Sequence, residues 1–360
     1  MYKRNQQLII ERGINGNIAC NDPLILNNAQ AAILDINLAN GTLPNHTPFE
    51  KHPYINLAEY QMQDFEKYII GTFPPISYIL DLLANPAILN LIKPGGGNIT
   101  KPKTPFFHGN QDDLWRLFLT NQEFNLFNLI VNRNERRTFL INKLIDFHIN
   151  YSDIIKTVQR ESYDAADSGL NNICPNLFLI KHILNNKNAK YLMFDTSSAH
   201  YSTGIKVNQR FCQDGNPGEV NVNNVQSFDL FLRTLQGLGF NLEIDFLNRL
   251  NWQNTQVWYP INAVNANFLN INLRTKVLTR LRIKNSKPFK VCENNFERFE
   301  QTYTIITGPS PVVSTRKSGD NLVFENWTNL NLNLDFNDFR KLIYQLFRAG
   351  NWPALQAMNI

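Results

Sequence analysis

Two adjacent carboxylates, Asp112 and Asp113, stand where a helix is predicted to begin, just before Trp115. A carboxylate in such a position can orient and activate a water molecule, and its negative charge can stabilise a cation that forms beside it. Acidic residues also favour helix N-termini, so both side chains could simply cap the helix. The residues alone leave catalysis and capping open.

Two other segments end predicted strands in turns that could bind a ligand. Residues 69–75 and 305–311 are each apolar and β-like, and each stops abruptly in a turn rich in Gly and Pro. Such turns bring backbone N–H groups to the carboxyl edge of an α/β sheet, where ligands bind. Taken alone, each segment is equally well explained as a plain connection between a strand and a loop.

Together with residues 106–116, these segments resemble the signature of the uracil-DNA glycosylase superfamily. Residues 71–75 (Gly-Thr-Phe-Pro-Pro) resemble its strand followed by a Gly-x-x-Pro turn, and residues 308–311 (Gly-Pro-Ser-Pro) resemble its His-Pro-Ser-Pro turn. Residues 106–116 resemble its aromatic pair, followed by a turn and an aromatic residue of the next helix. The resemblance covers residues 65–202 and 300–316, and it implies cleavage of a base from its sugar in DNA.

The chain departs from the family pattern at three places. The hypoxanthine-type branch has its catalytic Asn three residues before the Trp, where this chain has Asp112. Several branches carry a water-activating Asp or Asn in the first turn, where Thr72 and Phe73 stand here, and Gly308 replaces the His of the second turn. The resemblance therefore implies that Asp112 is the catalyst, with Asp113 as the competing candidate.

The resemblance also implies which residues hold the base and the DNA. Backbone groups of the first turn would polarise a flipped base, Phe73 would stack on it, and Asn side chains would read its edge. The implied base-binding residues are Gly71, Thr72, Phe73, His108, Asn110, Asn171 and Asn172, with Asn176 as a further amide. The implied DNA contacts are Ser197, Ser310, Ser314 and Arg316.

A basic stretch without acidic residues adds two candidates for DNA binding. Arg280 and Arg282 lie within residues 274–290, which also carry several lysines. Such a run is usually a solvated face, but beside a base-flipping site it would hold backbone phosphates. The formal net charge of +5 permits a polyanionic partner without requiring one.

Composition excludes several other classes of protein. The four cysteines are scattered without a CxxC pair, so neither a zinc site, a disulfide framework nor an iron–sulfur cluster is expected. No signal peptide, membrane span, phosphate-binding loop, His-Glu-x-x-His zinc motif or Gly-x-Ser-x-Gly elbow is found. We therefore expect a cytoplasmic protein that is a monomer, with no metal and no cofactor.

The sequence pattern predicts an α/β fold. Strands are expected at 67–71, 153–158, 190–195 and 304–306, and helices from 111, over 136–147, over 177–184 and over 337–348, the last ended by Gly350. The family resemblance implies a four-stranded parallel sheet flanked by helices. The expected parts are an N-terminal extension (1–64), a core (65–202 and 300–316), an insertion (203–299) and a C-terminal extension (317–360), all in one enlarged domain.

The activity implied is that of a monofunctional DNA glycosylase, because no Lys stands in a motif position to form a Schiff base. The substrate would be either uracil or hypoxanthine, or a bulky modified base of phage DNA such as glucosylated 5-hydroxymethylcytosine. The altered first turn and the long insertion favour a reshaped pocket and hence an antiphage role. Two alternatives stay open: a catalytically silent DNA-binding relative, and an unrelated α/β hydrolase with similar turns.

Overall fold

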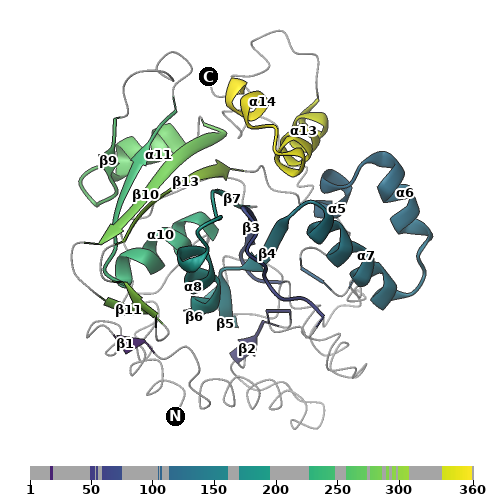
Figure 1. The fold of residues 1–360 in the computed structure, drawn as a ribbon, viewed down its shortest axis with the longest axis horizontal. Helices are drawn as coiled ribbons and strands as arrows, with labels where there is room; N and C mark the ends of the chain where they lie inside the picture. Colours follow the sequence, from purple (N-terminus) through teal and green to yellow (C-terminus); the bar gives the residue numbers. More distant parts are fainter. Residues whose placement is uncertain are drawn as a thin grey trace, which may run out of the picture.

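The computed structural model describes residues 17–18, 49–52, 54–55, 59–74, 104, 106–107, 113–160, 170–194, 227–247, 257–273, 276–285, 289–291, 294–296, 299–307 and 335–358. For residues 17–18, 49–51, 157–160, 170–172, 174, 289–291 and 294–296 it describes the backbone only. Within these ranges the chain forms a central sheet with helices on both faces (Figure 1). The predicted α/β class is confirmed.

The central sheet has seven strands in the order β4-β3-β7-β13-β10-β8-β9. Its strands are β3 (Lys67–Gly71), β4 (Ile149–Asp153), β7 (Tyr191–Phe194), β8 (Asn241–Asp245), β9 (Tyr259–Pro260), β10 (Leu278–Asn285) and β13 (Phe299–Thr307). β4, β3, β7 and β13 are parallel neighbours, whereas β10, β8 and β9 each pair antiparallel to the strand before them. The sheet is thus larger than the four-stranded one expected, and it is mixed.

Each face of the sheet is buried under its own set of helices. Side chains alternate along a strand, so Tyr68 and Ile70 of β3 enter one core and Ile69 enters the other. The first core is closed by α8 (Leu177–Asn185), α10 (Ser227–Gly237) and α11 (Ala266–Leu273). The second core is closed by α5 (Asp113–Phe118), α6 (Asn121–Leu129), α7 (Arg133–Asp146), α13 (Phe336–Ala349) and α14 (Trp352–Ala357).

Two small sheets flank the central one. One has the order β2-β5-β6, formed by β2 (Phe49–Lys51), β5 (Ile155–Arg160) and β6 (Leu170–Pro175), with antiparallel pairs. The other has the order β1-β11-β12, formed by β1 (Asn17–Ile18), β11 (Phe289–Val291) and β12 (Asn294–Phe296). Through β2, a segment ahead of residue 64 pairs with a strand of the predicted core.

The strands and helices with a clear hydrophobic pattern lie where the sequence predicted them, whereas one strand of the central sheet does not. β3, β7, α8 and α13 lie where they were predicted. The strand predicted over 153–158 largely coincides with β5, which begins at Ile155, but β5 lies in a different sheet from β3 and β7. The strand that pairs with β3 is β4, which ends at Asp153 and was not predicted. β4 buries the polar side chains Asn150, Ser152 and Asp153, so it lacks the apolar run by which a buried strand is recognised.

The predicted insertion builds part of the sheet. Within 203–299 the described residues include β8, β9 and β10, which lengthen the sheet beyond β13. β10 is anchored there because its Leu281 and Ile283 pack in the same core as α10. The insertion therefore enlarges the central sheet.

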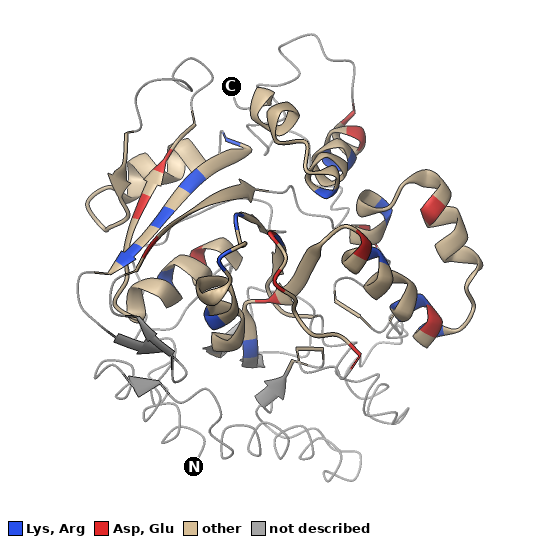
Figure 2. Cartoon of the chain, in the orientation of Figure 1, with Lys and Arg blue, Asp and Glu red and all other residues tan. Residues whose placement is uncertain are grey.

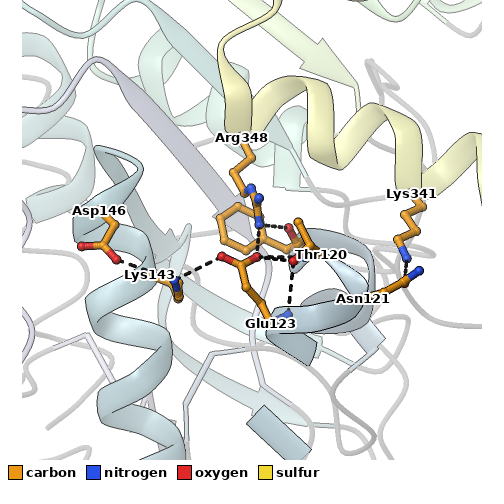
Figure 3. A network of polar contacts seen from close by, with 8 residues as sticks. Thr120, Asn121, Glu123, Lys143, Asp146, Lys341 and Arg348 are labelled. Carbon is orange, nitrogen blue, oxygen red and sulfur yellow. Dashed lines mark hydrogen bonds and ion pairs between the residues drawn. The ribbon is translucent and has the colours of Figure 1, made fainter. Parts of the chain in front are cut away.

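A polar network ties the C-terminal helices to the second core (Figure 3). Glu123 of α6 forms a capping box with Thr120 and accepts a hydrogen bond from Arg348 of α13 at 2.5 Å. Lys143 of α7 contacts its other oxygen at 3.1 Å. Burial raises the pKa of the Glu123 carboxyl, but the hydrogen bonds from Thr120, Arg348 and Lys143 outweigh burial and bring the pKa to about 2.

We predict that Glu123→Gln destabilises the protein by about 1–3 kcal/mol near neutral pH, because it removes charged hydrogen bonds. The folded-state pKa lies below the ordinary 4.5, so this stabilisation is complete above pH 4.5 and is lost as the pH falls toward about 2. Denaturant unfolding at a series of pH values checks this. The control, Glu59→Gln, removes an ion pair in which the Glu side chain is 55% exposed, and about 0.5 kcal/mol or less is expected. If the difference in free energy of unfolding between wild type and Glu123→Gln persisted down to pH 2, that result would contradict the account.

Gly350 ends α13 in the left-handed conformation, with φ of 68°. An added Cβ would meet only Trp352 at an ordinary 3.7 Å, so the cost of a side chain here comes from the backbone. We predict that Gly350→Ala lowers the free energy of unfolding by about 1–2 kcal/mol. Gly350→Asn is expected to lose less, since Asn tolerates this conformation. Equal losses in the two variants, measured by denaturant unfolding, would contradict the backbone explanation.

Candidate functional site

The carboxyl ends of the parallel strands meet at one edge of the central sheet. β3 ends at Gly71, β4 at Asp153, β7 at Phe194 and β13 at Thr307. Along the chain, β4 follows β3 and lies on one side of it, whereas β7 comes later and lies on the other side of β3. The direction in which strands are added to the sheet therefore reverses at β3. In open α/β sheets, ligands bind outside the carboxyl ends of the strands at such a reversal. This edge is the candidate site.

The turn after β3 is held by hydrogen bonds from the chain that follows β4. The carbonyl of Gly71 accepts from the N–H of Ile154 at 2.9 Å, and that of Thr72 accepts from Ile155 at 3.2 Å. Thr72 and Phe73 are both buried. The structure thus places the predicted residues Gly71, Thr72 and Phe73 together at the site, in a turn whose carbonyls are fixed.

Buried aromatic rings pack against β4 near this edge. The ring of Phe107 lies 4.8 Å from that of Tyr151 on β4, and Trp115 stacks on Phe106 at 5.9 Å. Phe106, Phe107 and Trp115 are almost completely buried. These three aromatic residues are therefore fixed beside β4, two strands away from β7 in the sheet order.

Asp113 is the first residue of α5 and is partly exposed. Across from α5, the helix α13 carries Arg340, which is buried and lies above the Phe336 ring at 5.3 Å. Burial lowers the pKa of the Arg340 guanidinium, and the negative charge of Asp113 opposes that effect. The C-terminal helix thus brings a positive charge near the acidic start of α5. Asp112 lies outside the described residues.

A buried histidine–aspartate pair lies at the same edge, and sequence reasoning missed it. Nε2 of His52 and Oδ2 of Asp153 are 2.7 Å apart, and the side chains are 0% and 5% exposed. The backbone N–H of Tyr54 donates to Nδ1 of His52 at 3.0 Å. The ring of His52 also lies 5.4 Å from Phe73 and 5.3 Å from Phe107. His52 and Asp153 are 101 residues apart, so no local spacing could have signalled the pair.

Asn176, proposed from the sequence as a reader of the base, has a structural role. Its amide nitrogen donates to the carbonyl of Asp153 at 3.0 Å, and its amide oxygen caps α8 by accepting from the N–H of Leu179 at 3.2 Å. The side chain is fully buried. Asn176 therefore holds the end of β4 against the start of α8.

The basic residues of β10 are compensated by acidic residues of the neighbouring strands. Arg280 forms a hydrogen-bonded ion pair with Asp245, and Arg282 forms one with Glu243. Lys284 also contacts Glu243. Red and blue segments alternate across β8 and β10 in Figure 2, so this face carries charges of both signs. A DNA phosphate would have to compete with these carboxylates for Arg280 and Arg282.

Lys276 is a second residue that the sequence analysis did not single out. It lies just before β10, next to Val277, whose carbonyl accepts from the N–H of Thr307 at the end of β13. Lys276 is buried, and burial lowers the pKa of its ammonium group. A buried amine therefore lies near the carboxyl end of β13.

Other predicted site residues are not placed by the structure. His108, Asn110, Asp112, Ser197, Ser310, Ser314 and Arg316 lie outside the described residues. Asn171 and Asn172 lie in β6, of which only the backbone is described there, and β6 belongs to the small sheet with β5. Their proposed contacts with a base or with DNA remain predictions.

Within the ranges that the structure describes, no group of three or more His, Cys, Asp or Glu side chains is arranged to hold a metal ion. Among the helices of those ranges, none combines the length and apolar character needed to span a membrane.

Comparisons of the chain with protein-family models, curated proteins and solved structures found no match.

DNA binding is what the family resemblance implies, and for such binding we predict that Arg282→Gln leaves the salt dependence unchanged, because Glu243 already compensates the Arg282 charge. Each lost phosphate contact would reduce the slope of log K against log salt concentration by about 1. Titration of a labelled duplex over a range of salt concentrations measures that slope. A decrease of about 1 in the variant would show that Arg282 holds a phosphate after all.

Proposed function

We propose that this protein is a monofunctional DNA glycosylase, which flips a base out of DNA and hydrolyses its N-glycosidic bond to leave an abasic site. One observation carries the proposal. Residues from separate parts of the sequence belong to one sheet edge or pack on it: the turn Gly71–Phe73, the rings of Phe107 and Trp115, and the end of β13. That edge is where an α/β sheet binds ligands.

The chemistry requires groups of several kinds. Cleavage leaves positive charge on the sugar and negative charge on the departing base, so a carboxylate is needed near the anomeric carbon and hydrogen-bond donors near the base. In the proposal Asp112 supplies the carboxylate, with Asp113 as its competitor, and the turn Gly71–Phe73 faces the base. Buried aromatic rings pack beside that turn and hold it in place.

The proposed substrates fall into two groups: uracil or hypoxanthine, and bulky modified bases such as glucosylated 5-hydroxymethylcytosine in phage DNA. Support for the second group comes from the insertion. β8, β9 and β10 widen the sheet beyond β13, and Lys276 adds a buried amine near the end of β13. The site edge is therefore longer than that of a four-stranded sheet, and an antiphage role follows if the bulky base is the substrate.

The test is abasic-site formation on DNAs that contain uracil, hypoxanthine, a thymine mismatch or glucosylated 5-hydroxymethylcytosine. We expect wild type to release a base from at least one of them and Asp112→Ala to lose about 10²-fold or more of the rate. Asp146→Asn is the matched control, since Asp146 is 61% exposed on α7 and is expected to change nothing.

The same experiment separates the alternatives. DNA binding without base release by wild type would favour the silent DNA-binding relative and overturn the proposal. Base release that survives Asp112→Ala but not Asp113→Asn would move the catalytic role to the first residue of α5. The substrate is named by whichever DNA loses its base.

A further inference from the structure

The Asp153–His52 pair occupies the position next to the altered turn. In the parallel pairing of β3 and β4, Asp153 lies opposite Gly71. Gly71 contributes no side chain, and the two residues that follow it, Thr72 and Phe73, carry no carboxylate. Asp153 is therefore a carboxylate that the strand next to the Gly71–Phe73 turn places beside that turn.

Asp153 lies on the face of the sheet that packs against Phe107 and Trp115. Residues two apart on a strand share a face, so Asp153 lies on the same face as Tyr151. The ring of Tyr151 contacts Phe107 and Trp115. Asp153 and these two aromatic residues thus lie on the same side of the sheet.

The hydrogen bonds of His52 determine which of its two ring nitrogens carries the proton. A backbone N–H can only donate, so Nδ1, which receives the N–H of Tyr54, carries no proton. The proton of the neutral ring is then on Nε2, which donates it to Oδ2 of Asp153. His52 therefore fixes one oxygen of the carboxylate and leaves the group able to accept a proton.

His52 engages one of the two carboxylate oxygens of Asp153. The contact at 2.7 Å is made by Oδ2. A carboxylate oxygen can accept from more than one donor, so Oδ1 is the oxygen through which Asp153 can hold a water molecule.

We propose that Asp153, oriented by His52, holds and deprotonates the water that attacks the sugar; this inference rests on the proposed glycosylase function. The bond between C1′ and the base nitrogen breaks with its electron pair leaving on the base. The water oxygen bonds to C1′, and its proton passes to Asp153 and from there to the departing base. His52 is a positioning residue, contributed by the segment ahead of the core.

The test compares Asp153→Asn with wild type on every DNA of the panel that loses its base. We expect the single-turnover rate to fall by about 10²-fold or more while the DNA dissociation constant stays within about twofold. The loss should be the same for every base, because water is common to all of these reactions. Unchanged circular dichroism and thermal melting show that the variant is folded.

Two His52 variants test the positioning role. Gln can present an N–H near the place of Nε2, so His52→Gln should keep much of the rate, whereas His52→Leu should lose about tenfold or more. A merely structural histidine would not separate these two variants in the chemical step. Equal rates in both, with both folded, would overturn the role of His52.

The outcomes distinguish this inference from the proposed function. Wild-type release with an equally active Asp153→Asn overturns only the inference. A loss confined to one base shows that Asp153 reads the edge of the base, and this also overturns the water-holding role. Absence of release by wild type from every DNA overturns the proposed function and the inference together.

Discussion

The pairing of β3 with β4 is the constraint on which the rest of the site depends. These strands run parallel with Gly71 opposite Asp153, and the hydrogen bonds continue past the strand ends through Ile154 and Ile155 to the carbonyls of the turn. This register sets the Gly-Thr-Phe turn beside a buried carboxylate. A slip by one residue would turn Asp153 to the opposite face and separate it from His52.

Segments outside the expected core complete the arrangement from both ends of the chain. The N-terminal part supplies β2 and His52, and the N–H of His52 donates to the carbonyl of Lys156 at 2.8 Å. The C-terminal helix α13 packs along α5 and brings Arg340 near Asp113. Lys67, at the amino end of β3, donates to the carbonyl of Arg348 at 2.8 Å and so ties α13 to the sheet. The additions are thus integral to the fold around the site.

Local pattern predicted the elements that obey simple rules and missed those fixed by distant partners. β3 and β7 are short apolar runs, and α13 ends at a left-handed Gly, so sequence alone locates them. β4 was not predicted because it buries polar residues, whose hydrogen-bond partners come from other segments. Asn150, for example, exchanges two hydrogen bonds with the backbone of Gln63. The basic stretch was predicted to be available for phosphates because it contains no acidic residue. The carboxylates that compensate Arg280 and Arg282 come from β8, which is distant in the sequence. Of the site, the first turn and the aromatic segment could be predicted, whereas the Asp153–His52 pair could not.

The central claim is that DNA engages the carboxyl edge at β3 and β4, and hydrogen–deuterium exchange tests it most directly. The full-length protein would be compared with and without a duplex that carries a tetrahydrofuran abasic analogue, a probe that does not depend on the identity of the base. The account predicts slower exchange in peptides that cover residues 71–74 and 104–118, and little change over β8 and β10. Protection confined to β8 and β10, or absent from the edge at β3 and β4, would contradict it.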